Sequence, residues 1–283
     1  MPVEVILIGR WTMPTATNFF SMPPERVTPR DEARFFGRLK TGNATFKRTE
    51  HGRLASVDAW LIHHFRASGA APQTALDIGI SSGVTTVEMA DAFNDAGYVV
   101  RFTGTDRSFE ARLVDVAPLC RVLVEPDGHI LQYGVMGRAI QPWRRRLDYV
   151  DGMIAARALL HRLLDKRARK QLAAGAGRLI VLVSPRLLHS AAIDLMENNV
   201  TMPEPCLTGR FDLVRAANIL NRHYFDHDSL LRAVANVRSY LRGPGAHLLV
   251  VRTLGDADHH GSLMRLRQDG SLAVVARYGN GSE

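Results

Sequence analysis

The sequence predicts an α/β fold. We expect a mostly parallel sheet with helices on both faces, an antiparallel C-terminal hairpin, an N-terminal helical cap and a helical insert. From residue 75 onward, apolar segments of strand length alternate with segments whose apolar residues recur at helical spacing. Asp-Gly pairs at 127–128 and 269–270 separate neighbouring apolar runs, and this dipeptide is typical of a hairpin turn.

Residues 1–30 contain five prolines, so an irregular start is expected. The stretch Thr28-Pro29-Arg30-Asp31-Glu32 then predicts a helix start: a capping residue, a proline in the first turn and two acids. A second helix is predicted at 53–67 and ends at the Ser-Gly-Ala-Ala-Pro stretch 68–72. We therefore expect an N-terminal helical cap over 1–72 and a second domain over 73–283.

Within 73–283 the alternation predicts the sheet and its helices in order. The expected elements are a strand at 75–79, a helix at 84–95, a strand at 99–105, a hairpin at 121–134, strands at 178–183 and 211–217, a helix at 228–241, and strands at 246–252, 262–268 and 272–278.

A helical insert is predicted near 135–177, with its main helical stretch at 143–173. One face is apolar, through Leu147, Val150, Ile154, Leu160, Leu164 and Ala168. The remaining positions are rich in Arg and Lys. This pattern fits a lid packed on the domain, a helix on a lipid surface, or a helix that pairs two copies of the chain in a homodimer.

Composition bounds the class of protein. The 283 residues are 46% hydrophobic, enough for a full core. No run reaches the length of a membrane span, and the first residues lack the features of a secretory signal. The two cysteines, Cys120 and Cys206, make no disulfide framework and no zinc pattern, so we expect a reducing, cytoplasmic setting.

The formal charge of +8 has two interpretations. It fits a protein from an arginine-rich proteome. It also fits an anionic partner such as nucleic acid, an acidic lipid surface or an acidic substrate.

The glycine stretch ALDIGISSGVTT, 75–86, suggests a ligand. Glycines after the first strand of a parallel sheet let a ligand approach the backbone. The G-x-G-x-x-G fingerprint of dinucleotide sites is absent, and Asp77 precedes the glycines. An acid suits a cation, and S-adenosylmethionine carries a sulfonium and an ammonium. The next strand ends at Asp106, which is placed to accept ribose hydroxyls.

Two further blocks follow: the strand and polar loop FDLVRAANILNRHYFD at 211–226, and the helix, Gly-Pro-Gly turn and strand at 229–251. In this order the four blocks resemble the class I S-adenosylmethionine-dependent methyltransferases, over roughly 74–280. The resemblance implies a Rossmann-like sheet. The loop at 218–224 also resembles that of the chemotaxis-receptor glutamate methyltransferases, but DIGISSG departs from that subfamily and no receptor-docking region is evident.

The resemblance also implies site residues. The cofactor's methionine end would lie at Asp77, Gly79 and Gly83, with loop contacts from Ser81 and Ser82. The ribose would be held by Asp106, with Arg107 beside it. The adenine side would be formed by Glu197 and Asn198, with Asn199 adjacent. The loop facing cofactor and methyl acceptor holds Asn218, Asn221, Arg222, His223 and Tyr224, of which Asn218, Asn221, His223 and Tyr224 are the catalytic candidates.

Structural roles are the alternative for each candidate. Asp77 could cap a helix, and the glycines could serve turn geometry alone. Asn218 and Asn221 could satisfy loose backbone groups at a strand end. His223 could be an ordinary surface histidine. The run from Asp256 to His260 has the composition of metal ligands without their spacing, so no metal site is expected.

The functional expectation is a methyltransferase of the EC 2.1.1 class that uses S-adenosylmethionine, releases S-adenosylhomocysteine and methylates a small molecule. The cap and the insert, two segments outside the core that flank the four blocks, motivate the small acceptor. The alternatives are an RNA or protein acceptor, motivated by the basic charge, and a catalytically inactive scaffold, because no clear catalytic base is visible.

Overall fold

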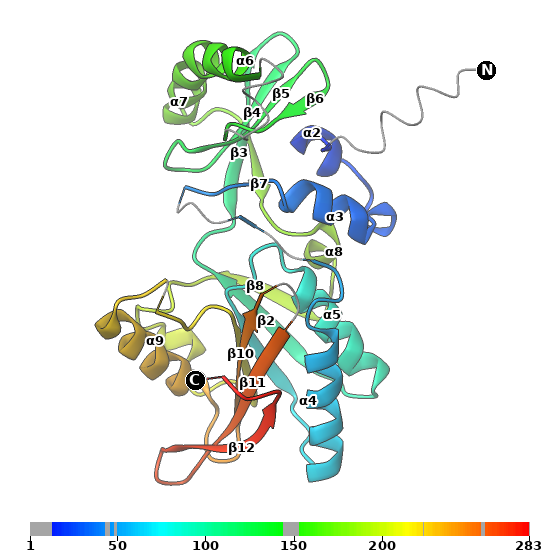
Figure 1. The fold of residues 1–283 in the computed structure, drawn as a ribbon, viewed down its shortest axis with the longest axis vertical. Coiled ribbons are helices and arrows are strands. Elements are labelled where there is room, and N and C mark those ends of the chain that lie inside the picture. The colour runs from blue at the N-terminus through cyan, green and yellow to red at the C-terminus, as the bar shows by residue number, and fades with distance from the viewer. Residues whose placement is uncertain are drawn as a thin grey trace, which may run out of the picture. The chain divides into compact units, whose positions relative to one another are not determined.

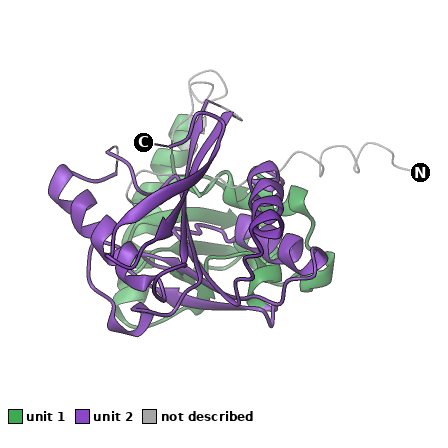
Figure 2. Ribbon diagram, turned by 90° about the horizontal axis from the view of Figure 1, so that it is seen from below, with its two compact units in different colours: residues 1–50, 109–188 green, residues 51–108, 189–283 purple. Residues whose placement is uncertain are grey.

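The computed structural model describes residues 13–42, 46–47, 50–143, 153–222, 224–255 and 258–282. The chain forms two compact units that interleave along the sequence (Figure 2). Unit 1 contains residues 1–50 and 109–188, and unit 2 contains residues 51–108 and 189–283. The division differs from the expected ranges 1–72 and 73–283. Helix α4 (Ala55–Ser68), which we expected in the cap, belongs to unit 2 because it packs on α5 (Val84–Asp95).

Unit 2 is built on a seven-stranded sheet in the order β12-β11-β10-β9-β1-β2-β8 (Figure 1). The strands are β1 (Thr74–Ile78), β2 (Arg101–Asp106), β8 (Ile193–Glu197), β9 (Leu213–Ala217), β10 (His247–Leu254), β11 (Asp258–Leu266) and β12 (Leu272–Tyr278). The pairs from β8 to β10 are parallel, whereas β11 and β12 are added antiparallel. The predicted mostly parallel sheet with an antiparallel C-terminal hairpin is confirmed.

Helices cover both faces of this sheet. On one face, Ala233, Val237 and Tyr240 of α9 (His227–Tyr240) pack in a cluster with Leu76 of β1 and Val214 of β9. Since side chains alternate along a strand, the neighbouring residues point to the other face.

On that face the rings of Phe65 from α4 and Phe93 from α5 lie 6.2 Å apart, and Phe93 lies 5.9 Å from Phe102 of β2. The predicted helices at 53–67, 84–95 and 228–241 are all present.

Unit 1 is built on a five-stranded antiparallel sheet in the order β6-β5-β4-β3-β7. Its strands are β3 (Glu110–Ala117), β4 (Cys120–Val124), β5 (Ile130–Val135), β6 (Arg138–Ile140) and β7 (Arg178–Val181). The predicted hairpin at 121–134 is confirmed as β4 and β5. The predicted strand at 178–183 is β7, but it pairs with β3 in this second sheet and not in the parallel sheet.

The insert is therefore larger and less helical than predicted. Strands β3 and β6 escaped prediction. In β3 the charged residues Glu110, Arg112 and Asp115 interrupt the apolar residues of EARLVDVA at 110–117, although both faces of the strand contribute to the core. The predicted helical stretch 143–173 contains α6 (Met153–Leu160), a π-helical turn (His161–Asp165) and α7 (Lys166–Ala173). The part of the predicted helix at 144–152 lies outside the described residues.

Two helical layers cover the unit 1 sheet. One contains α2 (Ala16–Phe19), the 3₁₀ turn Pro24–Arg26 and α3 (Pro29–Phe36), and the rings of Phe19 and Phe35 stack at 4.2 Å. On the opposite face, Leu164 and Ala168 pack on Val122 and Tyr133. The sequence predicted the cap and the insert as helical covers of the parallel sheet. In the structure they instead form a unit with a sheet and a hydrophobic core of its own.

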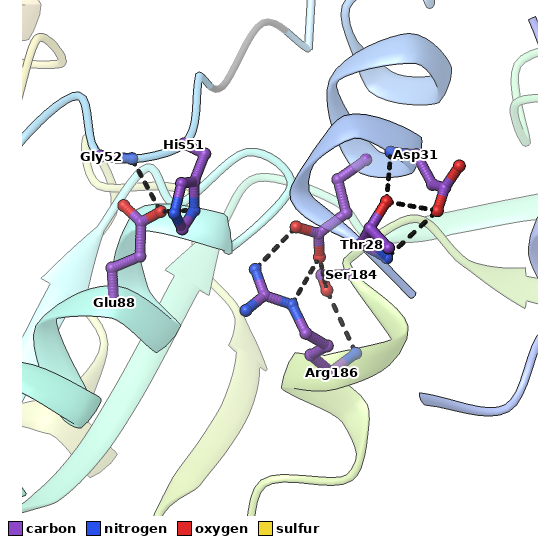
Figure 3. A network of polar contacts seen from close by, with 8 residues as sticks. Thr28, Asp31, His51, Gly52, Glu88, Ser184 and Arg186 are labelled. Carbon is purple, nitrogen blue, oxygen red and sulfur yellow. Dashed lines mark hydrogen bonds and ion pairs between the residues drawn. The ribbon is translucent and has the colours of Figure 1, made fainter. Parts of the chain in front are cut away.

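Helix α3 begins with the predicted cap: Thr28 accepts from the backbone N–H of Asp31, and the Asp31 carboxylate accepts from the N–H of Thr28 (Figure 3). One turn on, the buried Glu32 accepts from the guanidinium of Arg186 at 2.7 and 3.1 Å and from the hydroxyl of Ser184. This network ties α3 to the start of α8 (Pro185–Leu188) within unit 1. No helix in the described part of the chain is long and apolar enough to cross a membrane.

Candidate cofactor-binding site

The candidate residues of unit 2 converge because of strand direction. The strands β8, β2, β1, β9 and β10 are parallel, so their carboxyl ends share one edge. Numbered in chain order within this sheet, the strands run 3-2-1-4-5-6-7, and the order reverses between β1 and β9. Such a reversal creates the crevice in which doubly wound sheets bind their ligands.

Unit 2 is a Rossmann-like domain. Its switch point lies between the loop after β1, which carries Gly79, and the loop after β9, which carries Asn218. Asp106 follows on the next strand, and Glu197 of β8 lies beside it in register. The structure therefore brings to one edge the residues that the sequence pattern selected as a cofactor site.

The glycine loop after β1 has a strained, specific conformation. Gly79, Ser81 and Gly83 all have left-handed φ angles, of +73°, +58° and +75°. The N–H groups of Gly79 and Ile80 both donate to the carbonyl of Thr105, at 2.7 and 3.1 Å. A left-handed serine costs free energy and is found most often where function requires the geometry.

Asp106 is fixed by the backbone on two sides. Its Oδ2 accepts from the N–H of Ser81 at 2.7 Å, and its Oδ1 accepts from the N–H of Arg107 at 2.7 Å. Each carboxylate oxygen keeps a further lone pair, and the side chain is half-buried. The arrangement fits the recognition of a pair of hydroxyl groups, such as those of a ribose.

Asp77 has a cation of its own within the protein. Its Oδ1 accepts from Nε of Arg215 at 2.9 Å, and its Oδ2 accepts from Nη2 at 2.5 Å and from the hydroxyl of Thr86 at 2.7 Å. Nη1 of Arg215 also donates to Asp58 of α4 at 3.0 Å, and the three charged side chains are at most 4% exposed. The sequence suggested that Asp77 suits a ligand cation; the structure pairs it with Arg215.

Sequence reasoning missed Arg215 and Asp58. The available signal was the arginine inside the apolar strand FDLVRAA, since a buried guanidinium requires carboxylate partners. Burial raises the pKa of Asp58 from 3.8 to about 6, with the positive charge of Arg215 opposing the rise and the charge of Asp77 adding to it. The triad carries one negative charge more than positive when both acids are ionised.

Ser82, the next residue of the loop, is fully buried. Its Oγ has no hydrogen-bond partner among the residues that the structure describes. A buried hydroxyl left unpaired costs about 1–3 kcal/mol, so such atoms are rare and often face a ligand. Ser82 and Asp106 therefore fit a polar ligand at this edge, whereas Asp77 offers no open carboxylate to a cationic one.

Residues after β8 border the same edge. The hydroxyl of Ser108 donates to Glu197 at 3.1 Å, and the N–H of Asn198 donates to the carbonyl of Asp106 at 2.8 Å. Asn199 instead closes a local turn, because its side-chain oxygen accepts from the N–H and hydroxyl of Thr201.

The loop after β9 is held by its own amides. Asn218 has a left-handed φ of +61°; its side chain donates to the hydroxyl of Thr253 at 3.0 Å and accepts from the N–H of Thr253 at 2.7 Å. Asn221 donates to the carbonyl of Asn218 at 2.8 Å. These contacts match the backbone-satisfying alternative for both residues. Tyr224 is 54% exposed, and His223 lies outside the described residues.

A buried histidine lies beside this loop, and the sequence marked it only as part of the run from Asp256 to His260, not as a candidate for this site. Nδ1 of His259 in β11 is 3.0 Å from the hydroxyl of Thr253, which in turn contacts Asn218. Burial lowers the pKa of His259, so the neutral imidazole is favoured. Within the described ranges, no group of three or more His, Cys, Asp or Glu side chains is arranged to hold a metal ion.

Comparisons with known proteins give only distant similarities. No protein-family model matches the chain, and no curated protein matches it. Similar solved structures include the CMeT domain of the citrinin polyketide synthase, at 19% identity over 66% of this chain and 30% of that one, with a TM-score of 0.32. The N-methyltransferase NodS from Bradyrhizobium japonicum, in complex with S-adenosyl-l-homocysteine, shows 16% identity over 76% and 69%, with a TM-score of 0.34.

The amino pentose methyltransferase CalS10 from Micromonospora echinaspora, solved with bound SAM, shows 14% identity over 75% of this chain and 63% of that one, with a TM-score of 0.35. The chain spans about a third of the first of these structures and about two thirds of the other two. At such similarity the assignment of the Rossmann-like domain depends on its own strand order.

Proposed function

We propose that the Rossmann-like domain binds S-adenosylmethionine and that the protein transfers its methyl group to a small molecule, releasing S-adenosylhomocysteine. This is an activity of the EC 2.1.1 class. The observation that supports it is the Asp106 carboxylate, held by the N–H groups of Ser81 and Arg107 at the switch-point edge. A fixed acid after the second strand is the feature that recognises ribose hydroxyls in this type of sheet.

The other candidates receive roles around Asp106. The backbone of Gly79, Ser81 and Gly83 lets the ligand approach, and the hydroxyl of Ser82 donates to it. Glu197 and Asn198 form the adenine side. Asp77 acts indirectly, because its bonds to Thr86 and Arg215 hold the start of α5 under the glycine loop.

The loop after β9 would serve the methyl acceptor, through Asn218, Asn221, His223 and Tyr224. When bound, the cofactor supplies a methyl group on a sulfonium, for in-line transfer to a nucleophile. The protein's task is to orient the acceptor and exclude water. A small acceptor is supported by the segments outside the four sequence blocks, which now include a complete second unit.

Calorimetric titration with S-adenosylmethionine and S-adenosylhomocysteine tests the cofactor site. We expect micromolar binding in the wild type and a loss of about tenfold or more in Asp106→Ala. Asp95→Ala, which removes an exposed acid at the end of α5 in the same unit, is the matched control and should bind normally. Absence of binding of either ligand to the wild type would overturn the proposal.

A scaffold without methyl transfer is the second candidate, and two observations favour it. Asp77 is neutralised internally by Arg215. The side chain of Ile219 lies 3.2 Å from the position that a Cβ on Gly79 would take, so it occupies space beside the glycine loop. Cofactor binding without turnover on pooled metabolites, RNA or protein would support the scaffold. Turnover on RNA or protein would instead replace the small acceptor with a macromolecular one.

A further inference from the structure

A cavity of about 310 Å³ lies within unit 1, and every residue that lines it belongs to that unit. The volume falls at the lower end of the range for small-molecule sites. The residues that matter are Ile130, Pro142 and Trp143, which are apolar, and Lys40, Asp165 and Arg169, which are charged. The cavity shares no residue with the cofactor site proposed for unit 2.

The apolar part of the cavity is held in place by the fold. The indole N–H of Trp143 donates to the carbonyl of Arg38 at 3.1 Å, and the ring of Phe46 meets the indole edge-on at 5.4 Å. Ile130 is buried in the cluster beneath the unit 1 sheet. A rigid aromatic and aliphatic surface of this kind favours a flat apolar ligand, since little order is lost on binding.

The acid of the cavity is already satisfied. Asp165 accepts from the hydroxyl of the buried Tyr133 at 2.5 Å and lies 3.0 Å from Nδ1 of His161. Burial raises the pKa of Tyr133, and Asp165 adds to the rise, so the phenol stays protonated and keeps donating. Nε2 of His161 lies 3.1 Å from the carbonyl of Pro142.

Among the described residues, the two cations of the cavity, Arg169 and Lys40, lack the close polar partners that Asp165 has. Arg169 of α7 uses Nε to donate to the carbonyl of Gly128 at 3.3 Å, which leaves its two terminal amino groups for other acceptors. The ammonium of Lys40 lies 5.9 Å from the ring centroid of Phe46. In the described part of the chain, neither cation forms an ion pair with a carboxylate.

We propose that this cavity binds a small planar organic carboxylate, with its ring on the surface of Trp143 and Ile130 and its anionic group between Arg169 and Lys40. A guanidinium recognises a carboxylate through two parallel hydrogen bonds, and a nearby ammonium adds a point charge. The cavity volume limits the ligand to a small molecule, so the proposal does not extend to a nucleic acid or a protein segment.

The test compares 1-naphthoate with 1-naphthamide, which has the same shape without the charge, by calorimetric titration of the full-length protein. We expect naphthoate to bind about tenfold more tightly than the amide. The double variant Lys40→Gln/Arg169→Gln should lose this preference and still bind the amide as the wild type does. Unchanged amide binding shows that the variant is folded and that its cavity is intact.

The control is Arg167→Gln/Lys170→Gln, which removes two exposed cations from the same helix and should keep the preference for naphthoate. Equal affinity of naphthoate and naphthamide would overturn the proposal, as would an equal loss in both double variants or no binding of either compound. The experiment uses no cofactor, so it can fail while the proposed methyl transfer holds, and the converse is also true.

Discussion

Asp77 and Arg215 lie opposite each other in the register of β1 and β9, and both carboxylate oxygens of Asp77 accept from the guanidinium. The pair is buried at the switch point of the sheet, and Asp58 completes it from α4. The glycine loop thus rests on an internal ion triad. The triad makes unit 2 sensitive to changes at three positions far apart in the sequence.

Arg215→Met should destabilise unit 2 strongly. The substitution keeps much of the side-chain volume but leaves two buried carboxylates without a cation, which costs roughly 3–5 kcal/mol. Urea unfolding at neutral pH measures the change. Arg101→Met is the control, because Arg101 also lies on a strand and pairs with Asp194, but at the solvent-exposed surface. An unfolding midpoint for Arg215→Met as high as that of the control variant would contradict this account.

The stability of unit 2 should depend on the ionisation of Asp58. Its pKa is raised from 3.8 to about 6 in the folded state, so the folded protein binds its proton more tightly than the unfolded chain. The stabilising contribution is therefore complete below pH 3.8 and is lost as the pH rises through about 6. The difference corresponds to roughly 3 kcal/mol between the two limits.

Asp58→Asn tests this dependence, since the amide oxygen can still accept from Arg215 while carrying no charge. Urea unfolding midpoints at several pH values should fall less between mildly acidic and neutral pH in the variant than in the wild type. Asp95→Asn serves as the control and should follow the wild-type curve. Burial also lowers the pKa of His247 to about 4, so this residue makes stability rise with pH where Asp58 makes it fall. The effect of Asp58 is therefore read from the difference between the wild-type and Asp58→Asn curves.

Ser82→Ala should have opposite effects on stability and on ligand affinity. Removing a buried hydroxyl without a partner should stabilise the unliganded protein by about 1 kcal/mol. If the hydroxyl contacts the cofactor, the same change weakens cofactor binding. Melting temperature and calorimetric titration measure the two effects. Ser262→Ala, which removes a buried hydroxyl bonded to Ser282, should only destabilise. A parallel response of the two variants would argue against a ligand-facing Ser82.

Gly79→Ala should cost more stability than Gly97→Ala. Both glycines have left-handed φ angles, +73° and +84°, so both changes force alanine into an unfavourable conformation, at about 1 kcal/mol. Only at Gly79 does the added Cβ also meet the side chain of Ile219, at 3.2 Å. Adding Ile219→Ala should remove that second part of the effect, so the double variant separates backbone strain from steric overlap in urea unfolding.

Much of the Rossmann-like domain could be predicted because its signals are local. Helix α5 follows a glycine loop and has helical spacing throughout, and the hairpin of β11 and β12 turns at the Asp-Gly pair 269–270. Strand β3 was missed because Glu110, Arg112 and Asp115 interrupt its apolar residues, so the segment shows neither a continuous apolar run nor a regular alternation. The independence of unit 1 depends on β3 pairing with β7, a contact between distant segments that no local pattern encodes.

In the candidate site, too, features with a local signal could be predicted and those that depend on distant segments could not. The positions of Gly79 and Asp106 could be predicted because each follows an apolar strand. The partner of Asp77 could not, because it depends on which strand lies beside β1. The order of the sequence suggests that β2 lies on one side of β1, as it does. It does not show that β9 lies on the other side, with Arg215 directly opposite Asp77. The electrostatics of the site are thus set by sheet topology.

The interleaving of the units orders their assembly during synthesis. The chain passes between the units after residues 50, 108 and 188. Unit 1 has all of its residues once position 188 has left the ribosome, whereas β1 and β2 must wait for β8, β9 and β10 before their sheet can close. Residues 51–108 therefore emerge early and remain without most of their partners until the last third of the chain is translated. A nascent chain halted once residue 188 has emerged from the ribosome should contain a protease-resistant unit 1 and a cleavable segment around α4 and α5.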